Sequence, residues 1–382
     1  MSGARAEFVV QGWCPGALRP MMSGDGLVVR VRPNAGRLTA AQAMGIALAA
    51  RQHGNGLIDL SARANVQLRG VTAASHPALL DDLRALGLID ADIRAEARRN
   101  LLVTPFADAA TDDLATRLGD ALADAPELPG KFGFAVDTGP ASVLAAVSAD
   151  IRLEGDGKGG LILRCDGSAH GAPVDWATAP HRAVALARWF VAQGGVTNGR
   201  GRMAALLARG VVPTGPLQGT VAPASAAAMP GPGLVAQGAL VGFEFGQMQA
   251  ETLAQLAALG DLRVTPWRMV LVEGARALPN LPGLILRADD PLLRVQACTG
   301  APGCVQALRP VRPLARRLAA QVPVGQTLHV SGCAKGCAHP GPAALTLIAT
   351  DRGFDLVKGG SAQDTPHLTA LPEAGLDLKG LA

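Results

Sequence analysis

Four cysteines near the carboxyl end of the chain have the spacing of a metal site. Cys298 and Cys304 are separated by five residues, Cys333 and Cys337 by three, and twenty-eight residues lie between the two pairs. Four thiolates suit a [4Fe–4S] cubane, because iron–sulfur clusters take cysteine ligands from loops that can wrap around them. The pattern therefore predicts a cluster held by Cys298, Cys304, Cys333 and Cys337.

The residues between these cysteines favour the same interpretation. Glycines stand at positions 300, 303, 332 and 336. They let the backbone approach a cluster closely, and N–H groups of such loops can donate hydrogen bonds to its sulfurs. A structural zinc site, which prefers C-x2–4-C pairs, and four unrelated buried thiols are the alternatives. Cys14 and Cys165 fall outside the spacing, and we expect both to have packing roles.

A second candidate site is a polar segment in the first quarter of the chain. Between Leu60 and Arg69 every even position is apolar and every odd position is polar. In a strand this pattern packs one face and places the polar side chains ~6.5–7 Å apart on the other. Such a row suits a large ligand with several carboxylates, such as a tetrapyrrole, although a solvent-facing strand has the same pattern. The candidate ligand-binding residues are Arg63, Asn65, Gln67 and Arg69.

Further cations follow other predicted strands. Arg30 and Arg32 end the first strand, Arg99 and Asn100 precede the segment LLVTP, and Lys131 begins the segment KFGF. Taken singly, each is typical of a surface charge. Together with the polar segment they form a candidate clamp for an anionic ligand.

The elements that must position these residues occur twice. The segment from Leu27 reads as strand, turn, Ala-rich helix and strand, and the segment from Leu240 repeats that order. GRLTAAQ in the first segment corresponds to GQMQAET in the second, and LIDLSARANVQL corresponds to LRVTPWRMVL. The segment after Asp150 resembles the one after Leu345 in the spacing of its predicted strands and in its turn residues. Chance similarity of Ala/Leu-rich helices is the alternative, and the shared order of elements favours duplication.

The repeats predict how the chain is divided. We expect a first ferredoxin-like half-domain, a first reductase-like domain that carries the clamp, and a connector rich in Ala, Pro and Gly. A second half-domain, a second reductase-like domain with the cysteines, and a tail without a clear period follow. The expected ranges are 1–80, 81–214, 215–238, 239–285, 286–360 and 361–382.

Composition limits the class of protein. Of 382 residues, 49% are hydrophobic and 17% charged, and no apolar run approaches the ~20 residues needed to span a bilayer. Six cysteines are too few for a disulfide scaffold, and a net charge of +4 without basic tracts argues against nucleic acid. The first residues lack the pattern of a secretory signal, so we expect a cytoplasmic enzyme.

The cysteine spacing near the end of a duplicated chain resembles that of the sulfite and nitrite reductase family. The resemblance implies an α+β fold of duplicated ferredoxin-like and sulfite/nitrite-reductase-like α/β units with pseudo-two-fold symmetry. In that family the last cysteine bridges the cluster to a sirohaem iron, and by position this is Cys337. The family also clamps the carboxylates of its cofactor with an Arg on the first strand, an R-x-x-x-Q strand, an Arg-Asn pair and a K-x-K pair. The matching positions are Arg32, Arg63 with Gln67, Arg99 with Asn100, and Lys131.

The chain also departs from the reductase pattern. Gly133 replaces the second lysine of a K-x-K pair, and in the second half of the chain Arg268 is the cation left on the corresponding strand. We therefore expect one active site per chain, built from the clamp of the first half and the cluster of the second. The stretches CPG, PMMSGDGLVVR, RQHGNG and KFGFAVD resemble the branch of the family that acts in aerobic cobalamin biosynthesis.

That branch implies a monooxygenase which uses O2 and an electron donor, either NADH or a reductase or ferredoxin, to hydroxylate precorrin-3A at C-20. A ring-A acetate closes into a γ-lactone in the same conversion. The resemblance also implies an O2-activating non-haem iron whose ligands the sequence does not identify. His53, His329 and His339 are the nearest candidates. A sirohaem-dependent sulfite or nitrite reductase, and a cluster-bearing sensor or electron carrier without enzymatic activity, are the alternatives.

Overall fold

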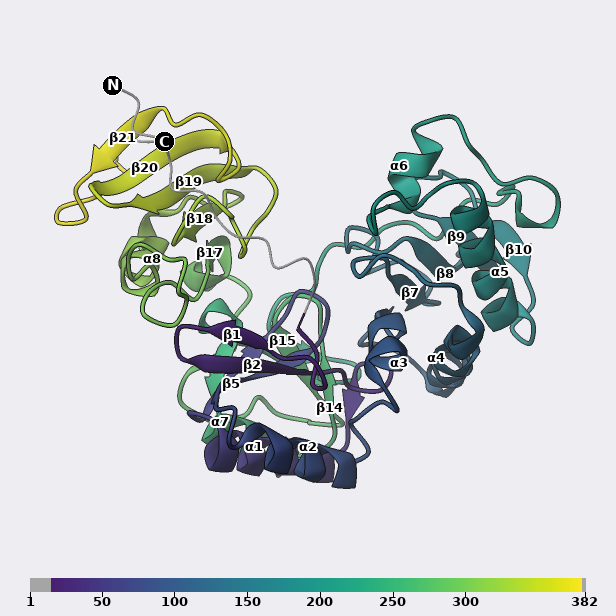
Figure 1. The fold of residues 1–382 in the computed structure, drawn as a ribbon, viewed down its shortest axis with the longest axis horizontal. Coiled ribbons are helices and arrows are strands. Elements are labelled where there is room, and N and C mark those ends of the chain that lie inside the picture. Colours follow the sequence, from purple (N-terminus) through teal and green to yellow (C-terminus); the bar gives the residue numbers. More distant parts are fainter. Residues whose placement is uncertain (1–14, 380–382) are drawn as a thin grey trace.

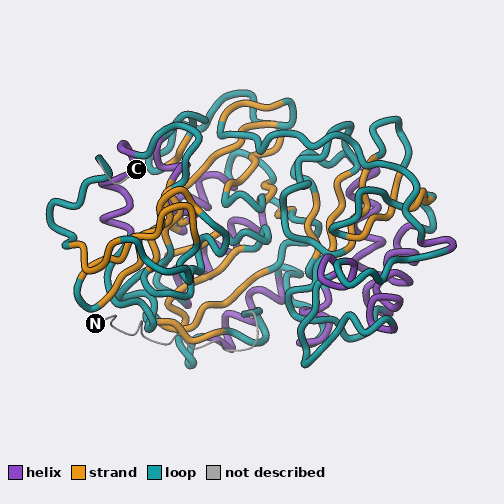
Figure 2. The backbone as a smooth tube through the Cα atoms, turned by 90° about the horizontal axis from the view of Figure 1, so that it is seen from above, coloured by secondary structure: helices purple, strands orange, loops and turns teal. Residues whose placement is uncertain are grey.

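The computed structural model describes residues 15–379, and in this part of the chain a central body carries one lobe on either side (Figure 1). Cys14 lies outside the described residues. The central body consists of two antiparallel sheets covered by helices. Seen from above, the strands of the two lobes gather at opposite ends of the molecule (Figure 2).

The first unit of the central body contains most of the first eighty residues. Its strands and helices are β1 (Met21–Ser23), β2 (Gly26–Val31), β4 (Leu57–Leu60), β5 (Val66–Val71), α1 (Ala40–His53) and α2 (His76–Ala85). Helix α1 begins in a capping box, because Thr39 accepts from the N–H of Gln42 while Gln42 accepts from the N–H of Thr39. The sheet has the strand order β1-β2-β5-β4.

The second unit repeats the first. It consists of β11 (Gly233–Val235), β12 (Gly238–Phe243), α7 (Ala250–Ala257), β14 (Leu262–Val264), β15 (Met269–Glu273) and β16 (Leu284–Ile285), with a 3-10 turn η3 (Glu244–Gly246). Its sheet order β11-β12-β15-β14 matches that of the first unit strand for strand. The predicted duplication is confirmed.

The two units exchange one short strand each. β3 (Arg37–Leu38), which precedes α1, pairs with β14 of the second unit, and β13 (Gln247–Gln249), which precedes α7, pairs with β4 of the first. One hydrophobic core fills both units, with Ile46 and Leu68 packed in the same cluster as Val241 and Leu256. The exchange and the shared core make the central body one pseudo-symmetric structure.

The two lobes also share one topology. The first has the sheet order β10-β9-β8-β7-β6 and the second β21-β20-β19-β18-β17, each with two parallel and two antiparallel pairings. The first-lobe strands are β6 (Leu101–Val103), β7 (Phe134–Asp137), β8 (Ile151–Gly155), β9 (Leu161–Cys165) and β10 (Ala172–Val174). The second-lobe strands are β17 (Val295–Ala297), β18 (Leu328–Ser331), β19 (Ala343–Thr350), β20 (Gly353–Gly360) and β21 (Leu368–Leu371).

Helices cover one face of each lobe sheet, and each lobe has its own core. The helices of the first lobe, together with the helix α3 that precedes it in the chain, are α3 (Ile93–Arg98), α4 (Ala109–Ala121), η1 (Leu122–Asp124), α5 (Ala179–Ala192), α6 (Met203–Leu207) and η2 (Gly215–Leu217). In the second lobe they are η4 (Pro291–Arg294), α8 (Arg312–Leu318) and η5 (Ala319–Gln321). No helix within residues 15–379 is both long and apolar enough to cross a bilayer.

Two predicted irregular segments contain strands. The end of the expected connector, Gly233–Val235, forms strand β11 because its backbone groups pair with β12. In the expected tail, Leu368–Leu371 forms β21, and Leu376 and Leu378 are buried in the core of the second lobe. Long-range pairing and burial order both segments, although neither has a clear sequence period.

Candidate functional site

The two cysteine pairs lie at one edge of the second-lobe sheet. Cys298 follows β17 directly, and Cys333 comes two residues after β18, which is parallel to β17. The carboxyl ends of neighbouring parallel strands meet at the same edge of a sheet, so the two cysteine loops start side by side. The N–H of Gly332 donates to Cys298 Sγ at 3.2 Å, which joins the two loops through a sulfur.

Glycines shape both loops. Gly300 and Gly336 have φ of 70° and 66°, in the left-handed region that favours glycine. A Cβ at Gly332 would lie 2.7 Å from Ala307 Cβ, so the loops also approach each other too closely for a larger residue there. These glycines allow the close packing of the two loops.

The four sulfurs lie within electrostatic range of one another. Burial raises the pKa of Cys298, Cys333 and Cys337, that of Cys337 to about 11, and charges on the neighbouring cysteines contribute to each shift. Cys337 nevertheless has the most exposed side chain of the four. Among the described residues no three His, Cys, Asp or Glu side chains converge closely enough for a single metal ion. Four cysteines on two loops, with an amide donating to one sulfur, fit a polynuclear iron–sulfur cluster.

The equivalent edge of the first lobe has no such cysteines. By strand register Thr104 occupies the position of Cys298, and its N–H bonds to Val136 O as that of Cys298 bonds to Val330 O. Gly139 occupies the position of Cys333, two residues after the strand. The candidate cluster site is therefore confined, within the described chain, to the second lobe.

The first central unit reaches the cysteine loop through the turn between β1 and β2. The carbonyl of Gly303 accepts hydrogen bonds from Ser23 Oγ at 2.6 Å, from Gly24 N at 3.2 Å and from Arg69 Nη2 at 2.8 Å. A Cβ at Gly24 would lie 2.0 Å from Pro302 O, so only glycine fits. The motif PMMSGDG thus contacts the loop between Cys298 and Cys304.

Buried charges continue this contact toward Cys298. Arg69 is only 4% exposed and pairs with Asp25 at 2.6 Å and with Asp59 at 3.1 Å. Burial opposes its charge, but the hydrogen bond to Asp25 and the charges of both carboxylates raise the pKa of Arg69. Asp59 also faces Arg312, which donates to Cys298 O at 3.2 Å. Arg69 therefore supports the cysteine loop and is held by protein carboxylates.

A second arginine reaches the cysteine loops from the other central unit. Arg268, in the turn between β14 and β15, donates to Gln296 Oε1 at 3.2 Å and to Ala338 O at 3.0 Å. Burial lowers the pKa of Arg268, and the nearby charge of Asp59 partly offsets this. Asp25, Asp59 and Arg312 were not predicted as site residues from the sequence. A charged residue between apolar strand positions, as in LIDL, is the signal that could have identified Asp59.

The polar segment from Leu60 to Arg69 is not one strand, and that prediction was wrong. It is a hairpin, because Ser61 Oγ accepts from the N–H groups of Arg63 and Asn65 and the chain turns at Ala64, whose φ is 52°. The second unit has the same turn, in which Thr265 Oγ1 accepts from the N–H groups of Trp267 and Met269. The alternating pattern does not reveal this turn, since the turn residues keep the alternation.

The structure nevertheless brings several predicted clamp residues together. Arg63 Nη2 donates to Lys131 O at 3.1 Å, and Asn100 Nδ2 donates to Phe132 O at 2.7 Å. A Cβ at Gly133 would lie 2.8 Å from Asn100 Nδ2 and 3.3 Å from Arg63 Nη1. The space beside position 133 is therefore filled by the amide and the guanidinium.

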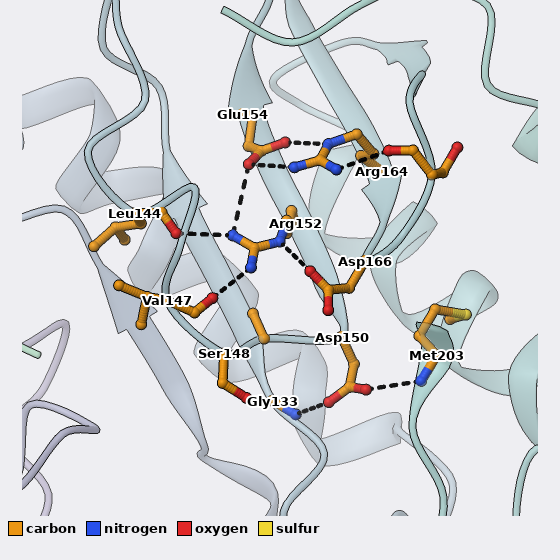
Figure 3. A network of polar contacts seen from close by, with 12 residues as sticks. Gly133, Leu144, Val147, Ser148, Asp150, Arg152, Glu154, Arg164, Asp166 and Met203 are labelled. Atoms are coloured by element: carbon orange, nitrogen blue, oxygen red, sulfur yellow. Dashed lines mark hydrogen bonds and ion pairs between the residues drawn. The ribbon is translucent and has the colours of Figure 1, made fainter. Parts of the chain in front are cut away.

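A buried polar network holds this segment in place (Figure 3). Asp150 accepts from the N–H groups of Gly133 and Met203, at 3.0 and 2.8 Å. The adjacent Arg152 is 2% exposed and bonds to Asp166 and to the carbonyls of Leu144 and Val147. Glu154 pairs with Arg164 at 2.6 Å beside it. This network was not predicted, although alternating charges in the strand DIRLEG indicate it.

The remaining clamp candidates have protein partners. Arg30 donates twice to Gln67 Oε1, at 3.1 and 2.7 Å, and Asn65 is buried in the hairpin turn. Arg99 forms a bidentate pair with Asp90 at 2.8 and 2.9 Å and donates to the carbonyl of Arg32 at 3.0 Å. Arg99 thus holds the backbone of Arg32.

The three histidines have different surroundings. His53 bonds to Asp82 at 2.7 Å at the end of α1, and His339 bonds to Pro342 O at 3.0 Å. His329, in β18, is completely buried, and neither ring nitrogen has a hydrogen-bond partner. Burial, His339 and Arg268 lower the pKa of His329 to about 4. Cys165 is buried in β9, and burial raises its pKa to about 12.

Comparisons with known proteins agree with this architecture. Residues 19–86 match the nitrite/sulfite reductase ferredoxin-like half domain. The chain is 33% identical to a precorrin-3B synthase from Sinorhizobium sp. over 93% of its own length and 84% of that protein. Its fold is similar to that of the NirA protein of Mycobacterium tuberculosis, with a TM-score of 0.64, 19% identity, and coverage of 87% of this chain and 75% of the other.

Proposed function

Since the chain belongs to the precorrin-3B synthase family, within the sulfite and nitrite reductase family, we propose that it hydroxylates precorrin-3A at C-20 in aerobic cobalamin biosynthesis. One oxygen atom of O2 enters the product, in which a ring-A acetate closes into a γ-lactone. The other leaves as water, formed with two electrons from the reductant, either NADH or a reductase or ferredoxin, and with two protons, of which NADH supplies one within its hydride and solvent supplies the rest. The reaction needs an electron path and a binding site for a polycarboxylate.

We propose that Cys298, Cys304, Cys333 and Cys337 hold the [4Fe–4S] cluster, which supplies single electrons when bound. The N–H of Gly332 at Cys298 Sγ and the close packing of both loops support this ligand set. The more exposed Cys337 is the thiol best placed to face a ligand outside the loops. Iron–sulfur thiolates must stay reduced, so we also place the enzyme in the cytoplasm.

For the substrate, we propose that Arg63, Asn100 and Lys131 bind carboxylates at the first-lobe side. Their backbone and side-chain contacts bring them together, and Lys131 is exposed. We also assign carboxylate contacts to Arg30 with Gln67, which lie on β2 and β5, and to Arg32, which follows β2. Three of the predicted residues do not contact the substrate in this proposal and instead hold other parts of the protein. Arg69 holds the cysteine loop, Asn65 holds the hairpin, and Arg99 holds the backbone of Arg32.

The observation that carries the choice between synthase and reductase is the packing around Gly133. A reductase-like clamp would need a lysine there, but Asn100 Nδ2 and Arg63 Nη1 already fill the space that its Cβ would enter. A permanent sirohaem would then lack one carboxylate partner. A substrate whose product must leave can be held less tightly. The family match to a nitrite/sulfite reductase half domain keeps a sirohaem reductase as the second candidate.

The experiment that decides is the characterisation of anaerobically purified protein. We expect about four irons and four sulfides per chain, cluster absorption without an intense sirohaem band, and binding of added precorrin-3A. Stoichiometric sirohaem together with reduction of sulfite or nitrite at enzymatic rates would overturn the proposal. A protein that contains the cluster but binds neither sirohaem nor precorrin-3A would indicate the sensor or electron-carrier alternative.

A further inference from the structure

His329 has no hydrogen-bond partner for either ring nitrogen, although the residue is completely buried. Buried polar groups in folded proteins are nearly always paired, because an unpaired one has lost its water without a replacement. The lowered pKa indicates a neutral ring, which carries one N–H donor and one acceptor. The ring can therefore make two hydrogen bonds for which the described residues supply no partner.

The neighbours of His329 in the sheet are not that partner. Gln296 and Thr346 flank it in register on β17 and β19, on the face opposite α8. Gln296 Oε1 accepts from Arg268, and Thr346 Oγ1 donates to Gly360 O. The His339 ring lies 5.8 Å away, centroid to centroid, and its Nε2 bonds to Pro342 O. Gln296 Oε1, Thr346 Oγ1 and His339 Nε2 are thus each bonded to a group other than the His329 ring.

The edge of the ring that bears the nitrogens faces the second cysteine loop. A Cβ built on Gly336 would lie 3.6 Å from His329 Cε1, the carbon between the two nitrogens. Gly336 lies between Cys333 and Cys337, and its φ of 66° keeps this stretch close to β18. The nitrogens therefore border the loop that carries two of the four cysteines.

We propose that His329 is a positioning residue of the cysteine site, whose N–H donates to a sulfur of the cluster or of its thiolates. The inference rests on the proposed function, because it needs a cluster in these loops. A hydrogen bond to sulfur stabilises the reduced, more negative state and so raises the reduction potential. His329 thus helps to set the potential at which electrons are delivered.

The first test compares reduction potentials in His329→Leu, His329→Gln and the wild type. Leu fills the space without a donor, whereas the amide of Gln retains one. We expect the potential to become more negative in His329→Leu and to shift less in His329→Gln. His181, exposed on α5, provides the matched control, and His181→Leu should leave the potential unchanged. A wild-type potential in His329→Leu would overturn the proposal.

The second test uses the wild-type protein, so it does not depend on whether the Leu variant takes up iron. With 15N-labelled histidine, pulsed EPR of the reduced protein should detect a weakly coupled nitrogen. The coupling should persist in His339→Gln and disappear in His329→Gln. No nitrogen coupling in the wild type, or coupling that survives in His329→Gln, would overturn the inference. A wild-type protein without iron and sulfide would instead overturn the cluster, so the two failures are distinguishable.

Discussion

The hydroxyl of Ser23 donates a 2.6 Å hydrogen bond to the carbonyl of Gly303, across 280 positions of the sequence. Gly303 precedes Cys304, so this bond and those from Gly24 and Arg69 connect the first central unit to the cysteine loop of the second lobe. The proposed cluster therefore depends on a turn that contributes none of its ligands.

Substitutions in this turn should loosen the cysteine loop. Ser23→Ala removes two hydrogen bonds, the one donated to Gly303 O and the one accepted from Arg69 Nη2, and each should contribute about 0.5–1.5 kcal/mol to the unfolding free energy. Gly24→Ala forces a Cβ against Pro302 O and should cost roughly 1–3 kcal/mol. Both should release iron to a chelator faster than the wild type, which urea unfolding and a chelator assay would measure. Ser168→Ala, which removes an exposed hydroxyl in the first lobe, is the control. Iron release equal to that of this control would show that the turn does not support the loop.

Each of the four candidate ligands should be necessary for the cluster. Serine at position 298, 304, 333 or 337 removes one thiolate, and a cubane that lacks one ligand is labile. Iron and sulfide analysis should show loss of the cluster in each of Cys298→Ser, Cys304→Ser, Cys333→Ser and Cys337→Ser. Cys165→Ala, in the core of the first lobe, should keep it. Four variants with full iron and sulfide content would disprove the assignment.

Arg63 and Arg99 should have different effects. Arg63→Ala should weaken binding of precorrin-3A by about 1.5–3 kcal/mol, roughly ten- to a hundredfold, and leave the iron content intact. Arg99→Ala should weaken binding through Arg32, and it should also lower the unfolding free energy because it leaves Asp90 unpaired. Titration calorimetry and urea unfolding separate the two effects. Arg287→Ala, at an exposed ion pair, is the control. Unchanged affinity in both variants would show that the clamp is misplaced.

Asp137 should make stability depend on pH. Burial raises the pKa of this carboxyl, and its Oδ1 has no hydrogen-bond partner. A raised folded-state pKa means that the contribution of Asp137 is complete below its ordinary pKa of 3.8 and is lost as pH rises through the folded-state pKa. Asp137→Asn cannot ionise, so its unfolding free energy relative to the wild type should increase as pH rises from 4 to 7.

Asp92 is the control for this prediction, because its pKa shift has the opposite sign to that of Asp137. Backbone hydrogen bonding at the start of α3 lowers the pKa of Asp92, so the contribution of Asp92 is lost as pH falls. Asp92→Asn should therefore lose stability relative to the wild type at neutral pH rather than gain it. Urea unfolding at a series of pH values measures both variants. If the unfolding free energies of Asp137→Asn and the wild type changed in parallel with pH, the raised pKa of Asp137 would be contradicted.

The sequence predicted local patterns better than the partners that distant segments supply. The duplication was recognisable because each unit repeats its own strand, turn and helix signals, and the cysteine pairs because their spacing is local. The hairpin at Ser61 was missed because two side-chain hydrogen bonds decide it while the polar alternation continues. Strand β21 was missed because its pairing with β20, and not its own pattern, orders it.

The roles of the arginines show the same limit. Arg63 was predicted from the polar alternation, and Asn100 and Lys131 from the family resemblance, and the structure brings the three together. Arg69 and Arg99 looked equally suitable, but Asp59, Asp25 and Asp90 hold them, and no spacing in the sequence reveals those pairs. Whether a buried arginine binds a ligand or supports a loop depends on carboxylates that folding brings from elsewhere.

The most direct test of the proposed function follows the oxygen atom. Purified, cluster-loaded protein supplied with precorrin-3A, a reductant and 18O-labelled O2 should form a product heavier than the substrate by one oxygen atom, and mass spectrometry should show that this atom is labelled. The same reaction without O2 should leave the substrate unchanged. Product formed without O2, an added oxygen that carries no label, or recovery of unaltered precorrin-3A from the complete reaction would contradict the assignment.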